Sequence, residues 1–106
     1  MRELLPAKPQ AVFAASDLLA LGAMRAVREA GMCVPDDIAF VGFDDLPIAA
    51  LPNPALTTVH QPIFELGVKA VELLLDLIDN GAWPARRVIM DTQLIIRASS
   101  GAFWRN

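Results

Sequence analysis

Polar side chains that could bind a ligand follow two apolar segments of the chain, at the points where the segments end. Ser16-Asp17 comes directly after residues 11–15, and Asp44-Asp45 comes directly after residues 38–43. Carboxylates there could accept paired hydrogen bonds from the vicinal hydroxyls of a sugar or nucleoside. Both pairs also have structural interpretations, because Ser-Asp often caps a helix and Asp-Asp often forms a turn.

Catalytic and metal-binding arrangements are not apparent among the remaining polar residues. Catalysis would need a nucleophile beside an oriented base, or an acid and a base matched across a pocket. A lone His60 and a lone Cys33 exclude a disulfide framework and a Cys/His zinc site. Magnesium at Asp44-Asp45 is an alternative, but it would want a further acid and a nearby lysine, and the only lysines are Lys8 and Lys69. We expect no enzyme activity, no metal and no cofactor.

The apolar pattern predicts the elements that would hold the candidate residues. Residues 11–15 and 38–43 show no polar alternation, which is typical of strands covered on both faces in a parallel sheet. A helix is predicted from Ser16-Asp17 to about Ala30, where Gly31 ends it. Residues 46–51 fit a short helix or turn.

Further along, residues 56–59 predict a third strand, residues 62–80 a long helix, and residues 88–96 another strand-like segment. The alternation of strands and helices indicates a parallel α/β sheet with right-handed crossovers. Neighbouring parallel strands would bring Ser16-Asp17 and Asp44-Asp45 to one edge of the sheet. Ligands of open parallel sheets bind at that edge.

The first predicted helix carries two apolar stripes. We expect the core stripe to consist of Leu19, Ala23, Ala26, Val27 and Ala30. Leu21 and Met24 fall on the opposite side together with Arg28. That second stripe indicates either contact with a partner subunit or side chains that are singly exposed.

The long helix at residues 62–80 is apolar around more than half its circumference. Its polar residues occupy one narrow stripe, formed by Glu65, Lys69, Glu72, Asp76 and Asp79. A helix of this kind should be covered from two directions, and the chain is too short to supply both covers. We therefore expect a fragment of a larger protein that is marginally stable alone or self-associates.

Composition limits the possible partners and locations. The 106 residues are 55% hydrophobic and carry a net charge of -3, with nine basic residues spread among twelve acidic ones. Because phosphate binding needs clustered basic residues, this segment should not bind nucleic acid directly. No segment predicts a signal peptide or a membrane span, and a single cysteine suits a reducing cytoplasm.

Several blocks of the sequence resemble regulators of the lactose-repressor and galactose-repressor family. Residues 11–31 resemble the segment around their Asn-Asp-x-x-Ala-x-Gly motif, residues 34–45 their following strand, and residues 54–62 the next block. The resemblance covers about residues 9–101 in matching order. It implies a truncated three-layer lobe from the carboxyl-terminal part of a type I periplasmic-binding-protein-like effector domain. Complete members carry a helix-turn-helix headpiece that binds operator DNA as a dimer.

The resemblance also implies roles for individual residues. Ser16 stands where many members have an effector-contacting asparagine, Asp17 completes that motif, Asp44 matches a common effector contact, and Gln61 lies on the hinge side. Serine is the main departure from the family pattern, and its shorter hydroxyl would lose the usual contact or reach it through water. The implied homodimer surface comprises Leu21, Met24, Arg28, Leu51 and Pro52.

By the same resemblance, residues 1–60 and 92–106 would form the carboxyl-terminal lobe and residues 61–91 part of the other lobe. The expected function is sugar or small-molecule sensing and dimerisation in an allosteric cytoplasmic transcriptional regulator. Operator DNA would be bound only through the headpiece, and no membrane partner is expected. The alternative is a fragment of a periplasmic sugar-binding protein of a transporter, which shares the fold.

Overall fold

Four strands form one sheet in the computed structural model, which describes residues 1–81 and 83–104. Their order is that of the sequence: β1 (Ala11–Phe13), β2 (Ala39–Asp44), β3 (Thr57–His60) and β4 (Gln93–Ile95). β1, β2 and β3 are parallel, as predicted, so the α/β class with a mostly parallel sheet is confirmed. The last strand, β4, is antiparallel to β3.

β4 is much shorter than the strand predicted over residues 88–96. Its pairing with β3 begins where His60 lies opposite Gln93 and continues to Thr58 opposite Ile95. Residues 88–92 lie beyond the end of β3, so they have no neighbouring strand there to satisfy a ladder of backbone hydrogen bonds. Their β-branched side chains alone do not make a strand.

Helix α1 (Asp17–Glu29) follows the predicted bounds closely. The hydroxyl of Ser16 caps it by accepting from the Leu19 amide at 3.3 Å, and Gly31, with a φ of 77°, follows its end. On its exposed side, Glu29 accepts hydrogen bonds from Arg2 and Arg25, which hold the pKa of its carboxyl below the ordinary value of 4.5.

The face that α1 turns to the sheet differs in part from the predicted one, although Val27 is buried as expected. Met24 is only 2% exposed, whereas Leu19, which was predicted to lie in the core, is 62% exposed. Two apolar stripes compete on this helix, and the buried set continues from the buried side chain of Asp17 at helical spacing through Ala20, Met24 and Val27. Met24 therefore does not belong to an exposed interface stripe, and that prediction is wrong.

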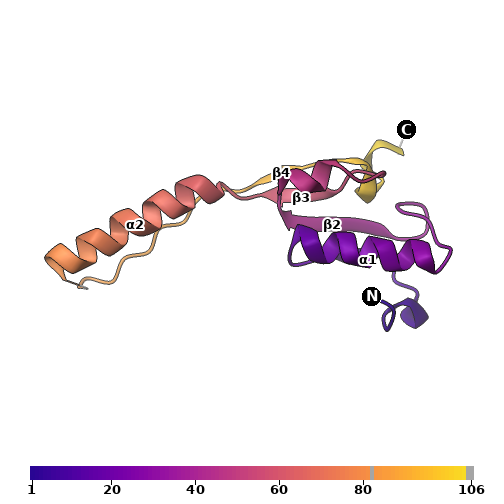
Figure 1. The fold of residues 1–106 in the computed structure, drawn as a ribbon, viewed down its shortest axis with the longest axis horizontal. Helices are drawn as coiled ribbons and strands as arrows, with labels where there is room; N and C mark the ends of the chain where they lie inside the picture. The colour runs from indigo at the N-terminus through magenta and orange to yellow at the C-terminus, as the bar shows by residue number, and fades with distance from the viewer. Residues whose placement is uncertain (82, 105–106) are drawn as a thin grey trace.

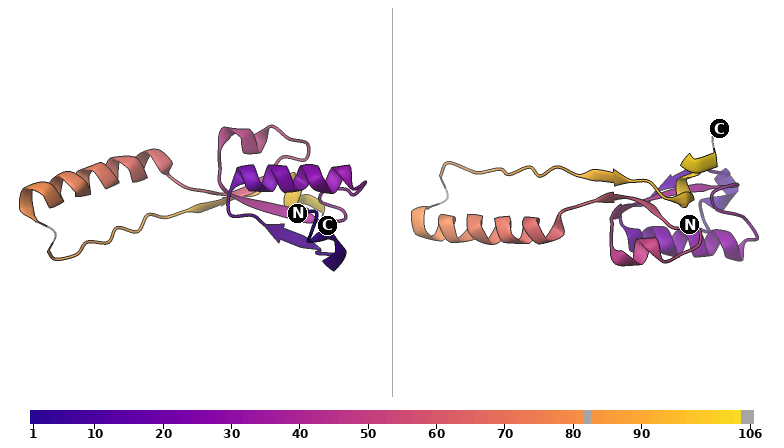
Figure 2. Two further views of the ribbon diagram at one scale, coloured as in Figure 1. Left: turned by 60° about the horizontal axis from the view of Figure 1, so that its bottom comes forward. Right: turned by 90° about the horizontal axis from the view of Figure 1, so that it is seen from above.

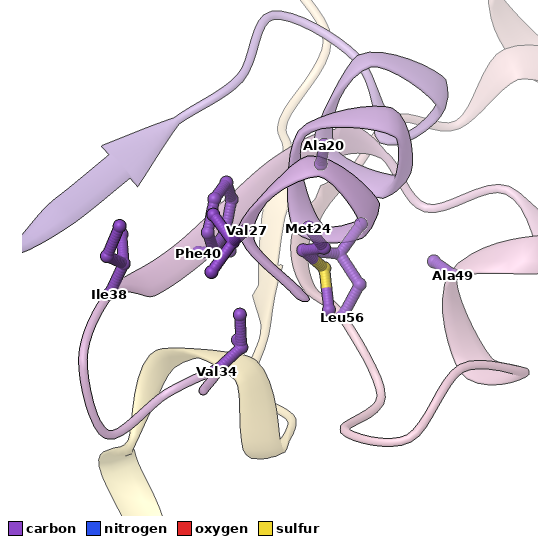
Figure 3. Packing of buried hydrophobic residues seen from close by; sticks show 8 residues of the cluster. All are labelled: Ala20, Met24, Val27, Val34, Ile38, Phe40, Ala49 and Leu56. Carbon is purple, nitrogen blue, oxygen red and sulfur yellow. The ribbon is translucent and has the colours of Figure 1, made fainter. Parts of the chain in front are cut away.

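The core lies between α1 and one face of the sheet (Figure 3). It consists of Ala20, Met24, Val27, Val34, Ile38, Phe40, Ala49 and Leu56. The opposite face is less covered: Phe13 in β1 is 66% exposed, so the prediction that this strand is covered on both faces is wrong. Among the described residues, α1 is the only long helix that packs on the sheet (Figure 1).

Helix α2 (Ile63–Asn80) extends away from the sheet as an arm, with residues 83–92 running back beside it (Figures 1 and 2). The molecule is consequently elongated, with extents of 57 × 31 × 21 Å. No residue of α2 is buried, and Phe64 is 79% exposed. The predicted helix is thus confirmed, and its two apolar faces lie open in the described part of the chain.

Candidate functional site

Polar residues from three segments meet beyond the carboxyl ends of the parallel strands. Asp44 ends β2 and lies in register with His60, which ends β3. The amide of Leu46, two residues after β2, donates to Asp17 Oδ2 at 2.7 Å, which joins this segment to the start of α1. The sequence-based prediction that the two acidic groups share one edge of the sheet is confirmed.

Asp44 and Gln61, both predicted to bind a ligand, contact each other at this edge. Gln61 Nε2 donates to Asp44 Oδ1 at 2.8 Å, and the two side chains are partly buried. Among the hydrogen bonds of the described residues, Asp44 Oδ2 accepts none, and the Gln61 carboxamide keeps an oxygen acceptor. The pair could therefore both accept hydrogen bonds from hydroxyl groups and donate to their oxygens.

Asp17 lies below this surface and is fully buried. Its Oδ1 accepts from the Thr58 hydroxyl at 2.5 Å, and its Oδ2 accepts from the Leu46 amide at 2.7 Å. Because its side chain is fully buried, a ligand bound at the edge would not touch it in this conformation. The contacts support a role in positioning the edge of the sheet rather than the predicted direct contact with a ligand.

Gly42 explains how this carboxylate fits against β2. A Cβ at position 42 would lie 2.4 Å from Asp17 Oδ1 and 2.9 Å from Leu56 Cδ2. These distances are shorter than any ordinary van der Waals contact, so only glycine allows the side chain of Asp17 to approach the strand. In the sequence, Gly42 is marked only as one position of the apolar run at residues 38–43.

Ser16 caps α1 through the Leu19 amide, as the structural interpretation predicts. Its side chain is partly exposed, and a serine hydroxyl that accepts one bond can still donate another. Its location next to Asp17 keeps it near the edge where Asp44 and Gln61 meet.

Asp45 lies at the centre of a cluster with Arg97 and His60 that was not predicted from the sequence. Its Oδ1 accepts from Arg97 Nη2 at 2.9 Å, and its Oδ2 lies 3.0 Å from His60 Nδ1. The side chains of Asp45 and Arg97 are only 17% and 22% exposed. No local signal could have identified Arg97, because it lies 52 positions from Asp45 in the sequence.

The backbone at this point adopts an uncommon conformation. Asp44 has a φ of 111° and Asp45 a φ of 57°, which are values that residues with a Cβ adopt only at a cost. A residue held in such a region costs about 1–3 kcal/mol and persists only where its surroundings over-determine it. The bonds to Asp17 and Arg97 on either side of the turn supply that constraint.

Two aromatic rings lie near the same edge. Phe13 at the end of β1 and Phe43 in β2 meet edge to face, with centroids 6.4 Å apart and an interplanar angle of 87°. Phe13 is largely exposed. Apolar aromatic surface next to a few convergent polar groups is typical of small-molecule sites.

Metal binding and membrane insertion find no support in these residues. Within residues 1–81 and 83–104, no three His, Cys, Asp or Glu side chains gather closely enough to hold a metal ion. Both oxygens of Asp45, a carboxylate considered for magnesium, already contact Arg97 and His60. None of the helices described combines the length and apolar character needed to cross a membrane.

The remaining predicted interface residues lie on α1, at Leu21 and Arg28, and in the loop before β3, at Leu51 and Pro52. Arg28 donates to the carbonyl of Asn53 and so joins the helix to the loop that contains Leu51 and Pro52. Leu51 is 80% exposed, while Leu21 is partly buried against the core. Arg28 and Leu51 are thus exposed and Leu21 and Pro52 are partly exposed, whereas Met24 is buried.

Comparison with known proteins identifies the family. Residues 1–100 match the periplasmic binding protein-like domain. The HTH-type transcriptional repressor CytR of Escherichia coli (strain K12) is 41% identical over 98 residues, which cover 92% of this chain and 29% of the repressor. The HTH-type transcriptional regulator CelR of Thermobifida fusca is 43% identical over 101 residues, which cover 93% of this chain and 30% of that regulator.

Solved structures give the same picture. A complex of the transcriptional regulator CelR with cellobiose superposes with a TM-score of 0.85 at 41% identity, over 92% of this chain and 31% of that one. The lac repressor dimer bound to operator and an anti-inducer superposes with a TM-score of 0.81 at 35% identity, over 92% of this chain and 30% of that one. The chain thus spans about three-tenths of the length of these relatives. It belongs to the periplasmic-binding-protein-like family, in the form that transcriptional regulators of the lactose-repressor type carry.

Proposed function

We propose that this chain is the effector-sensing part of a bacterial transcriptional regulator and that Asp44 and Gln61 contact the effector. The observation that carries the proposal is the 2.8 Å hydrogen bond between these side chains at the carboxyl edge of the sheet. In open parallel sheets, ligands bind at this edge. Ser16 would add a hydroxyl to the site, and Asp17 would support it from below.

A polar metabolite with vicinal hydroxyls, such as a sugar, suits these groups. The carboxylate of Asp44 can accept from two hydroxyls at once, and the carboxamide of Gln61 can both donate and accept. Phe13 offers exposed aromatic surface against which an apolar ring face can pack. Among the similar structures, one regulator was solved with cellobiose and another with ribose, which supports the same chemical class of effector here.

The division into lobes extends this proposal. Residues 1–60 and 92–106 would form one lobe, and residues 61–91 would belong to the other, so that the effector binds between them. The uncovered faces of α2 support this division, because apolar side chains such as Phe64 and Ile78 are largely exposed. The cover would come from segments that the longer relatives possess.

The complete protein would act in the cytoplasm as a homodimer and bind operator DNA through a helix-turn-helix headpiece outside this chain. Its dimer surface would include Leu21, Arg28, Leu51 and Pro52. Effector binding would change the relative orientation of the lobes and thereby the spacing of the two headpieces. We propose no enzyme activity. The relatives described above are regulators, which favours this role over that of a transporter component.

A panel of compounds tests the effector site directly. Thermal shifts of the protein as its gene encodes it would be measured with cellobiose, D-ribose, other mono- and disaccharides, and nucleosides. At least one compound should raise the Tm, and Asp44→Asn should abolish the rise, since one charged acceptor is lost. Asp36→Asn, which neutralises an exposed carboxylate in a turn far from the site, is the matched control. An equal shift in the Asp44→Asn and Asp36→Asn variants would refute the assignment.

A further inference from the structure

We infer that Asp45 and Arg97 are positioning residues that hold the carboxylate of Asp44 in its binding direction without touching the effector. The inference deepens the proposed function, because it concerns how the same site is kept in shape. It starts from the ion pair that joins the segment after β2 to the segment after β4.

Both oxygens of Asp45 are engaged, so its side chain has one available orientation. Oδ1 accepts from Arg97 at 2.9 Å, and Oδ2 lies 3.0 Å from Nδ1 of His60. The ion pair with Arg97 is mostly shielded from water, with exposed fractions of 17% and 22% for the two side chains. A pair in such a location is screened less by salt than one on the surface.

Arg97 is itself fixed in several places, which makes it a firm anchor. Its Nη1 donates to the carbonyl of Leu56 at 2.9 Å. Its backbone amide donates to Thr57 Oγ1 at 2.8 Å, and that hydroxyl donates to the Arg97 carbonyl at 2.8 Å. Asp45 is therefore tied to the start of β3, which belongs to the rigid sheet.

The anchored side chain of Asp45 holds the backbone of residues 44 and 45 in its uncommon conformation. Asp44 and Asp45 have φ values of 111° and 57°, and Leu46 is held by Asp17 on the far side. Without the bond from Asp45 to Arg97, the turn could relax toward the common right-handed region. Such a change would rotate Asp44 away from Gln61 and break their 2.8 Å contact.

Asp45→Asn tests the ion pair without changing the preference of the residue for a positive φ. Asparagine tolerates a positive φ at least as well as aspartate, so the variant removes the charge and leaves the local conformational preference intact. Glu29→Gln is the matched control, since it also neutralises a carboxylate that two side chains hold, in this case Arg2 and Arg25 on the exposed side of α1.

Hydrogen–deuterium exchange of the protein as its gene encodes it, resolved to single amides by mass spectrometry, tests the inference without any ligand. Three amides report on the turn: Asp45 donates to Thr58 at 3.4 Å, Leu46 donates to Asp17 at 2.7 Å, and Gln61 donates to the carbonyl of Asp44 at 3.5 Å. In Asp45→Asn and in Arg97→Gln, we expect exchange at these amides to rise about tenfold, corresponding to about 1.4 kcal/mol. Exchange in the middle of α1 should not change.

Each other outcome would overturn the inference. Unchanged exchange at these amides would mean that the pair does not hold the turn, and a rise spread over α1 and β2 would mean that it only stabilises the fold. The double variant Asp45→Asn/Arg97→Gln should match Asp45→Asn at the three amides, since the two residues act as one unit. The thermal-shift panel tests the effector site separately from the exchange experiment. Failure of the proposed effector site is therefore distinguishable from failure of the proposed Asp45–Arg97 anchor.

Discussion

Replacing Asp17 with alanine would remove the acceptor of one buried and one partly buried hydrogen bond. The Thr58 hydroxyl, 2.5 Å from Oδ1, and the Leu46 amide, 2.7 Å from Oδ2, would lose their partner, and the side chains of Asp17 and Thr58 are fully buried. A hydrogen bond to a charged group contributes about 1.5–3 kcal/mol, and an unsatisfied buried donor adds its own penalty. Allowing for rotation of the Thr58 hydroxyl toward another partner, we expect a loss of about 3–5 kcal/mol from the free energy of unfolding.

Asp17→Asn removes the negative charge but keeps the shape of the side chain and one oxygen acceptor. The asparagine oxygen can accept from the Leu46 amide, and the Thr58 hydroxyl can turn to accept from the new amide group. We therefore expect a loss of only about 1–2 kcal/mol. Thr58→Val removes one of the two donors and should lie between the two Asp17 variants. Urea unfolding with unchanged m values, followed by at least two probes, measures all three losses.

The results would also decide the role of Asp17. A loss below about 1 kcal/mol in Asp17→Ala would refute the hydrogen-bonding argument. If Asp17→Asn kept nearly full stability but lost the response to the effector, Asp17 would contact the ligand, as the sequence motif suggests. Retained effector binding in Asp17→Asn, with reduced stability, would support its role below the site.

Two further substitutions test the packing around the site and the proposed dimer surface. Gly42→Ala should cost about 1–3 kcal/mol in urea unfolding, because the new methyl group overlaps Asp17. Gly67→Ala, whose Cβ would meet nothing within 4 Å, should stabilise α2 instead, and equal effects would contradict the packing argument. In the complete protein, Leu51→Glu should dissociate the proposed homodimer in analytical ultracentrifugation without lowering the Tm of the monomer. Leu4→Glu, at another exposed leucine, is the control, and an unchanged dimer in Leu51→Glu would remove Leu51 from the interface.

Local signals predicted the bounds of the two long helices well. Ser16 and Gly31 delimit α1 because a capping hydroxyl and a residue that tolerates positive φ act on the adjacent turn of the helix. The rotation of α1 was not predictable in this way. Its two stripes are both apolar, so hydrophobicity alone does not decide whether Met24 or Leu19 faces the sheet. The contacts of Asp17 with β3 and with the segment after β2 belong to one rotation only.

Most contacts between segments that lie far apart in the chain could not be predicted from the sequence. The motif identified Asp44 and Gln61, which are separated by 17 positions and do meet. Asp45 was visible as a carboxylate, but any of the arginines could have been its partner. Arg97 becomes the partner only because β4 runs antiparallel beside β3. This short strand, β4, was also the element that the sequence predicted least well.

Asp44 and Asp45 are chemically identical neighbours, yet the structure uses their carboxylates differently. Both oxygens of Asp45 have a partner, Arg97 or His60, whereas within residues 1–81 and 83–104 the Asp44 side chain accepts one hydrogen bond, from the neutral amide of Gln61 to Oδ1. A carboxylate already neutralised by a guanidinium gains little from a sugar hydroxyl, while one paired with a neutral amide retains its full charge for a ligand. The left-handed turn sends the two side chains to these different partners. The different use of two adjacent aspartates therefore depends on backbone conformation, which is why the inferred anchor of this turn would be inseparable from the proposed binding site.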